Sequence, residues 1–172
     1  MKTTRFFWTT LIMAVSTRGL ATPSSREAVV RQYFQGVNDQ NPALIRECFA
    51  TSAVIQDVCG LNTSRRTAEA EQLVERCMEF LAAHPDTVVD FHYGPECGRS
   101  SNWVVAHWYE TGTWSGKSCG LEPRHEPMAV EGQTRFLVNE DDKITELVVT
   151  RTFTDWEKQM LLQRQAESTA QA

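Results

Sequence analysis

Two residues of this 172-residue chain have types and spacing that suit acid–base chemistry on a small molecule. Tyr33 lies in an amphipathic aromatic stretch, residues 32–39, and Asp57 lies in an apolar, strand-like run, residues 53–58. A carboxylate in such a strand is costly to keep charged unless it is solvated or used. The pair therefore predicts a cone-shaped pocket with Asp57 as a candidate general base and Tyr33 as a candidate donor. A solvated structural aspartate and a plain core tyrosine are the alternative interpretations.

A third candidate, His107, lies in a long strand-like segment, residues 102–114. Alternation places it on one face with Trp103 and Tyr109, and places Trp108 on the opposite face. His107 either lines the cavity or lies on a sheet surface that faces a partner subunit, and its pKa can be tuned near neutrality in both positions. Aromatic side chains on both faces favour a homodimer.

Several other chemistries lack a signal in the sequence. There is no G-x-S-x-G elbow, no Cys–His nucleophile signature and no glycine-rich phosphate loop. Clustered ligands for a metal ion are also missing, so we expect no metal site. We expect no cofactor either, because proton transfer alone needs none. The formal net charge of −5 argues against nucleic acid as a partner, because phosphate binding needs a concentrated basic face.

The five cysteines are an odd number, which leaves at least one unpaired within a monomer. Cys48 and Cys77 fall on apolar helix faces, so we expect them to be small buried hydrophobic residues. Cys97 and Cys119 flank the long strand, so a disulfide between them is one alternative. Asn62 begins an N-glycosylation pattern.

The first 26 residues contain no Asp or Glu, and basic residues precede an apolar run at 6–15. Small residues follow at two cleavage points, after Ser16 and after Ala21. This layout predicts a removed targeting segment over residues 1–21, either a secretory signal or an organelle transit peptide, and plastid import is one alternative. The mature protein is then secreted or organellar and is not held in a membrane; a disordered or membrane-associated tail is the other interpretation.

The rest of the chain predicts one domain with helices first and strands later. Expected helices cover residues 25–39, 41–50, 67–83 and 155–166, with a loop at 60–66 and a flexible tail at 163–172. Expected strands cover residues 54–58, 87–93, 102–114, 128–139 and 144–153. This order indicates an α+β fold in which a curved antiparallel sheet and three N-terminal helices enclose a pocket.

In the order of its segments, the chain resembles the nuclear transport factor 2-like (cystatin-like) superfamily, and within it the SnoaL-like polyketide-cyclase group. The domain covers residues 25–162. The resemblance is carried by residues 33–41, 48–50, 53–57, 80–86, 104–116, 136–144 and 153–156.

The resemblance extends to ketosteroid isomerase, an enzyme of this superfamily that stabilises an enolate, and implies roles for particular residues. Asp57 corresponds to its general base and Tyr33 to its oxyanion donor, whereas its second donor, an aspartate, falls near Thr134. Similarity to SnoaL-like cyclases makes His107, Glu131 and Arg151 candidate acid–base groups. The expected pocket residues are Phe34, Trp103, Tyr109, Thr134, Phe136 and Arg151.

Two functions are compatible with these residues. The first is binding of a small apolar molecule, with isomerase or cyclase chemistry that uses Asp57, Tyr33 and His107 and no cofactor. The second is a non-catalytic module of the same fold that holds a ligand or docks a protein. The weak donor at Thr134 favours the second function, and a cavity filled by Phe136 or Trp103 would favour it further.

Overall fold

The computed structural model describes residues 24–59, 62–98, 101–118 and 121–170. The elements are α1 (Ser25–Asn38), α2 (Pro42–Cys48), β1 (Phe49–Cys59), β2 (Asn62–Glu69), α3 (Ala70–Ala83), β3 (Val88–Cys97), β4 (Trp103–Thr113), β5 (Pro127–Val138), β6 (Ile144–Arg151) and α4 (Asp155–Ala170). The expected targeting segment, residues 1–21, lies outside the described residues, as does Cys119. Its suggested partner Cys97 carries a free, half-buried thiol.

The first two helices begin where the sequence predicts. Ser24 caps α1 and forms a reciprocal capping box with Glu27. Asn41 caps α2 by accepting a hydrogen bond from the Leu44 N–H at 3.1 Å. The two helices approach closely at Gly36, where an added Cβ would lie 2.9 Å from the Ile45 side chain. This close approach packs α1 against α2.

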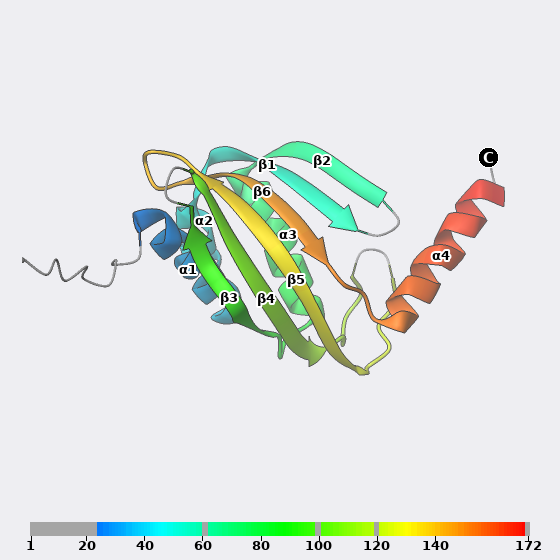
Figure 1. The fold of residues 1–172 in the computed structure, drawn as a ribbon. Helices are drawn as coiled ribbons and strands as arrows, with labels where there is room; N and C mark the ends of the chain where they lie inside the picture. The colour runs from blue at the N-terminus through cyan, green and yellow to red at the C-terminus, as the bar shows by residue number, and fades with distance from the viewer. Residues whose placement is uncertain (1–23, 60–61, 99–100, 119–120, 171–172) are drawn as a thin grey trace, which may run out of the picture.

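The six strands form one sheet in the order β2-β1-β6-β5-β4-β3, and α1, α2 and α3 cover one of its faces (Figure 1). The sheet is curved and does not close, and the expected α+β class is confirmed. One pairing differs from the expected antiparallel sheet, because β1 and β6 run parallel.

A second difference is β2, which occupies the segment expected to be a loop. Its residues are polar and show no apolar alternation, so the sequence lacks the usual strand signal. β2 is an edge strand that pairs only with β1, and an edge strand needs little apolar surface. Because β2 runs to Glu69, α3 begins at Ala70 and not at Thr67.

Burial alternates along the central strands and separates the two faces of the sheet. On β4 the inward residues are Val104, Ala106, Trp108 and Glu110, whereas the intervening residues are partly exposed. Burial on β5 follows the same rule from Met128 to Val138. We call the helix-covered side the inner face and the opposite side the outer face. The main core lies between the inner face and the first three helices.

A smaller core lies where α4 meets the loop after β4. Trp114 packs there against Trp156, with ring centroids 4.7 Å apart. Beyond this contact α4 projects away from the sheet (Figure 1), and it continues to Ala170 and not only to about residue 166. Within the described ranges, no helix combines the length and apolar character required to cross a bilayer.

Candidate functional site

Tyr33 points from α1 into the core beside the inner face. Its ring makes edge-to-face contacts with Phe34, Phe49 and Phe136 at centroid distances of 5.2, 5.8 and 5.6 Å. The Cys77 thiol lies close enough to the Tyr33 hydroxyl for the two groups to affect each other's pKa. Burial raises the pKa of Tyr33 far above its ordinary value, and the nearby Cys77 raises it further. Tyr33 is therefore a protonated hydrogen-bond donor at every physiological pH.

Asp57 lies on the same side of the sheet as Tyr33. It is opposite Val149 in the register of β1 and β6, and its carboxylate forms an ion pair with Arg76 of α3 at 2.8 Å. The Asp57 side chain is 22% exposed, and its charge is close enough to Tyr33 to contribute to the raised pKa of the hydroxyl. The structure thus places the two residues that the sequence singled out on the same side of the sheet.

Three other expected site residues, His107, Trp103 and Tyr109, lie on the outer face. The alternation was predicted with the right phase, but the inward residues are the other set, which includes Trp108. Tyr109 donates a hydrogen bond to Asp90 at 2.9 Å, and His107 packs beside His92 with ring centroids 5.3 Å apart. This network is separated from Tyr33 and Asp57 by the thickness of the sheet.

The remaining expected pocket residues belong to the inner face. Phe34 and Phe136 are 6% and 0% exposed, so aromatic rings fill the space next to Tyr33. Thr134 accepts a hydrogen bond from the Trp108 indole N–H at 2.9 Å. Arg151 ends β6 and forms an ion pair with Glu157 of α4 at 2.5 Å.

Sequence reasoning missed the inner-face residue Glu110. Its side chain is 4% exposed, and burial, opposed by the nearby Arg151, raises its pKa to about 7. The signal was present, because Glu110 shares the phase of Trp108 in an alternating strand. A charged residue at an inward position of a strand marks either an ion pair or a functional group.

Neighbouring titratable groups are mostly neutral at pH 7. Burial raises the pKa of Cys77 to about 11 and that of Cys48 to about 12, so both remain thiols. Burial lowers the pKa of His84, which is only 3% exposed. In the part of the chain that the structure describes, no three His, Cys, Asp or Glu side chains gather where they could hold a metal ion.

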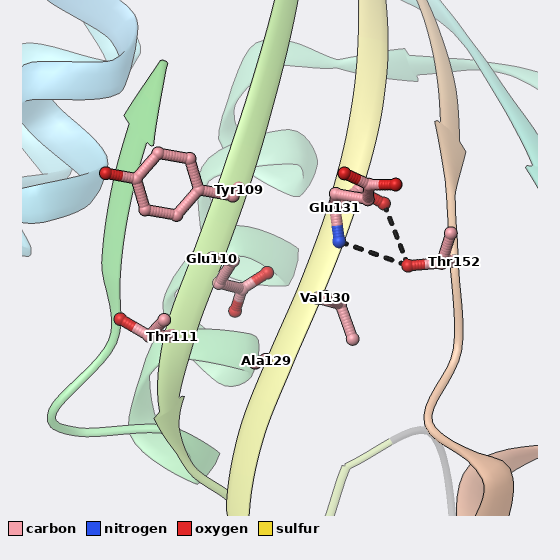
Figure 2. Close-up of a pocket in the computed structure, with 7 residues that line it drawn as sticks. All are labelled: Tyr109, Glu110, Thr111, Ala129, Val130, Glu131 and Thr152. Atoms are coloured by element: carbon pink, nitrogen blue, oxygen red, sulfur yellow. Dashed lines mark hydrogen bonds between the residues drawn. The ribbon is translucent and has the colours of Figure 1, made fainter. Parts of the chain in front are cut away.

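Two shallow hollows adjoin each other on the outer face, beside β4, β5 and the end of β6, and outer-face residues such as Tyr109, His107 and Glu131 line them. The larger, of about 370 Å³, includes Glu110, Val130 and Thr152 in its lining, and Figure 2 shows the Glu110 side chain between the two strands. The smaller, of about 180 Å³, includes Arg151, and both include Glu131 and Thr152.

A family model, the SnoaL-like domain, matches residues 30–147, which is well over half of the chain. The chain belongs to the SnoaL-like family. No protein among the curated sequences matches it significantly.

Solved structures show the same fold at low sequence identity. One is a candidate SnoaL-like polyketide cyclase from Jannaschia sp. CCS1, with a TM-score of 0.64, 19% identity, and coverage of 83% of this chain and 95% of that one. Another is SalBIII, an epoxide hydrolase/cyclase-like enzyme in pyran ring formation in the polyether salinomycin, with a TM-score of 0.57, 20% identity and coverage of 76% and 92%. A cystatin-like protein from Methylobium petroleophilum PM1 has a TM-score of 0.58, 14% identity and coverage of 78% and 80%. These likenesses identify the fold and leave the reaction open.

Proposed function

We propose that this SnoaL-like protein binds a small apolar molecule with a carbonyl group at the inner face and moves a proton on it, as an isomerase or cyclase does. The observation that carries the proposal is the placement of Tyr33 and Asp57 on the same side of the sheet. Their surroundings are mainly apolar, which suits a ligand of low polarity.

The two residues suit complementary roles in such a reaction. The Asp57 carboxylate would take a proton from the carbon next to the carbonyl. The Tyr33 hydroxyl, held in its protonated form, would then donate a hydrogen bond to the enolate oxygen. Returning the proton to another carbon completes an isomerisation, so this step needs no cofactor.

Solvent deuterium exchange into an apolar ketone such as 2-tetralone, followed by proton NMR, tests this function. We expect exchange above the buffer rate, and a fall of about 10²-fold or more in Asp57→Asn. Tyr33→Phe should reduce the rate as well, whereas Tyr93→Phe, at an exposed tyrosine, should leave it unchanged. Equal rates in the wild type, Asp57→Asn and buffer would exclude this catalysis.

The second candidate is a non-catalytic module, and one specific observation favours it. Phe136 has no exposed surface and contacts Tyr33 and Phe34, so it fills the space that a ligand would occupy. Phe136→Ala would open this space. If the module only holds a ligand, Phe136→Ala should bind more 2-tetralone without any exchange.

A further inference from the structure

A second group of polar side chains lies on the inner side, near the start of α4, and the roles above do not use it. Glu110 comes from β4, Thr87 from the turn before β3, and Arg151 from the end of β6. Glu110 and Thr87 are each 4% exposed. The register places Glu110 opposite Val89, directly beside the Thr87 turn.

Each of these side chains has a buried polar atom without a partner. Within the described residues, Glu110 Oε1, Thr87 Oγ1 and Arg151 Nη1 make no hydrogen bond. The Thr87 hydroxyl is close enough to Glu110 to oppose the rise in its pKa, but it does not reach hydrogen-bond geometry. Buried polar atoms are costly to leave unpaired, so three in one place indicate that a polar partner is missing there.

Neighbouring groups cannot supply that partner, because their own hydrogen bonds are already made. Glu157 pairs with Arg151 through one oxygen, and its other oxygen accepts hydrogen bonds from the backbone and hydroxyl of Thr154. Thr134 is engaged by the Trp108 indole. The missing partner must therefore come from outside these side chains.

The charges define the chemistry of that partner. Arg151 and the carboxylate of Glu157 face Glu110 from β6 and α4, and Cys77 faces it from α3 as a neutral thiol. Arg151 Nη1 and Thr87 Oγ1 can each donate a hydrogen bond to an oxygen, and Glu110 can accept or donate a proton. An acidic hydroxyl, as in a phenol or an enol, satisfies all three atoms.

We propose that Glu110, Thr87 and Arg151 form a second binding subsite, which takes an acidic hydroxyl of the ligand. On binding, the ligand O–H bond breaks and the proton moves to a Glu110 carboxylate oxygen. The resulting oxyanion accepts hydrogen bonds from Arg151 and Thr87. This proton transfer balances without any other reactant.

The subsite rests on the proposed function, because both would bind the same ligand. It also requires that this ligand be long enough to reach from Asp57 to Glu110. The residues Asp57, Val149, Thr134 and Ala106 form one row across β1, β6, β5 and β4. Glu110 lies four residues past Ala106, about 13 Å along the strand, and three strands away from Asp57. A ligand that contacts both sites must therefore be elongated and carry oxygen at both ends.

Absorbance titration with 4-nitrophenol tests the subsite, because its phenolate form absorbs visible light. We expect saturable binding by the full chain, a Kd at least tenfold higher in Glu110→Gln, and less than a twofold change in Glu146→Gln. Glu146 is a matched control, since its side chain is 15% exposed and its carboxylate pairs with Arg65 on the outer face. Circular dichroism establishes that each variant is folded.

A measurement on the unmodified chain covers the case in which Glu110→Gln does not fold. With ¹³C-labelled glutamate, the Glu110 carboxyl resonance should shift when 4-nitrophenol is added, and the Glu146 resonance should not. A saturable interaction that leaves Glu110 unshifted, or that is unchanged in a folded Glu110→Gln variant, would overturn the subsite.

The two proposals fail in distinguishable ways. Probe binding that depends on Glu110, without ketone exchange, supports the subsite and removes the catalytic function. Ketone exchange without probe binding supports the function and removes the subsite. If neither probe binding nor ketone exchange is observed, both the subsite and the catalytic function are excluded.

Discussion

Glu110 holds a carboxyl group where the neutral form is favoured. In the unfolded chain this group has its ordinary pKa of 4.5, whereas in the folded protein the value is about 7. Between these values the folded state keeps a proton that the unfolded state has released. Unfolding therefore releases a proton in this window, and the free energy of unfolding falls as pH rises.

This difference gives a pH prediction for Glu110→Gln. Between pH 4.5 and pH 7 the wild type should lose about 3 kcal/mol relative to the variant, because the glutamine carries no titrating proton. Urea unfolding at a series of pH values measures this. Glu75→Gln, an exposed change on α3, should run parallel to the wild type. A pH-independent gap between the wild type and Glu110→Gln would contradict the buried carboxyl.

The Trp108–Thr134 hydrogen bond gives a second prediction for a single side chain. Thr134→Val keeps the shape but removes the acceptor, so the buried indole N–H is left unpaired. We expect a loss of about 1–3 kcal/mol in the free energy of unfolding. Thr134→Ser retains the hydroxyl and should lose less. A Thr134→Val variant as stable as the wild type would show that this hydrogen bond does not contribute to stability.

Adjacent strands β4 and β5 pack closely at Gly132. A Cβ added there would lie 2.4 Å from the Trp108 ring and 2.7 Å from the Thr150 carbonyl oxygen. Gly132→Ala should therefore move Trp108 and destabilise the protein by about 1–3 kcal/mol. Thermal unfolding together with tryptophan fluorescence measures both effects. Gly98→Ala, where the nearest atom would be 3.3 Å away, is the control.

Helix α4 is attached mainly through its first turns. The Glu157 carboxylate accepts a hydrogen bond from the Thr154 N–H and forms an ion pair with Arg151. Trp156 packs on Trp114. Glu157→Ala should remove both polar links and increase amide hydrogen exchange in α4, with little change in β4 and β5. Glu167→Ala, an exposed change near the far end of the helix, should not. Unchanged exchange in Glu157→Ala would mean that the tryptophan contact alone holds the helix.

The outer face of the sheet carries aromatic side chains that could form a homodimer interface. Trp103, His107 and Tyr109 are partly exposed there, and Tyr93 is 53% exposed. We expect this face to pair with a second copy, since a sheet face with several aromatic side chains suits a dimer interface. Tyr109→Glu should then shift the mass measured by light scattering from dimer to monomer, and Glu75→Lys on α3 should not. A monomeric wild type would exclude this interface.

Local signals in the sequence were sufficient for most elements. The caps at Ser24 and Asn41, the alternation of β4 and β5, and the start of α4 are all short-range patterns. Such patterns act within a few residues, so a single sequence reveals them. Tyr33 and Asp57 were also identified as a pair, through the family resemblance and the order of their elements.

Tertiary structure alone decided which face of the sheet is buried, because alternation gives the phase of a strand but not the side on which the helices pack. That choice placed Glu110 inside and His107 outside. The formation of the polar edge strand β2 and the parallel pairing of β1 with β6 also depend on tertiary structure, because each requires pairing with another strand that no local pattern predicts. The raised pKa of Glu110 likewise arises from burial by several elements, and no local pattern contains it.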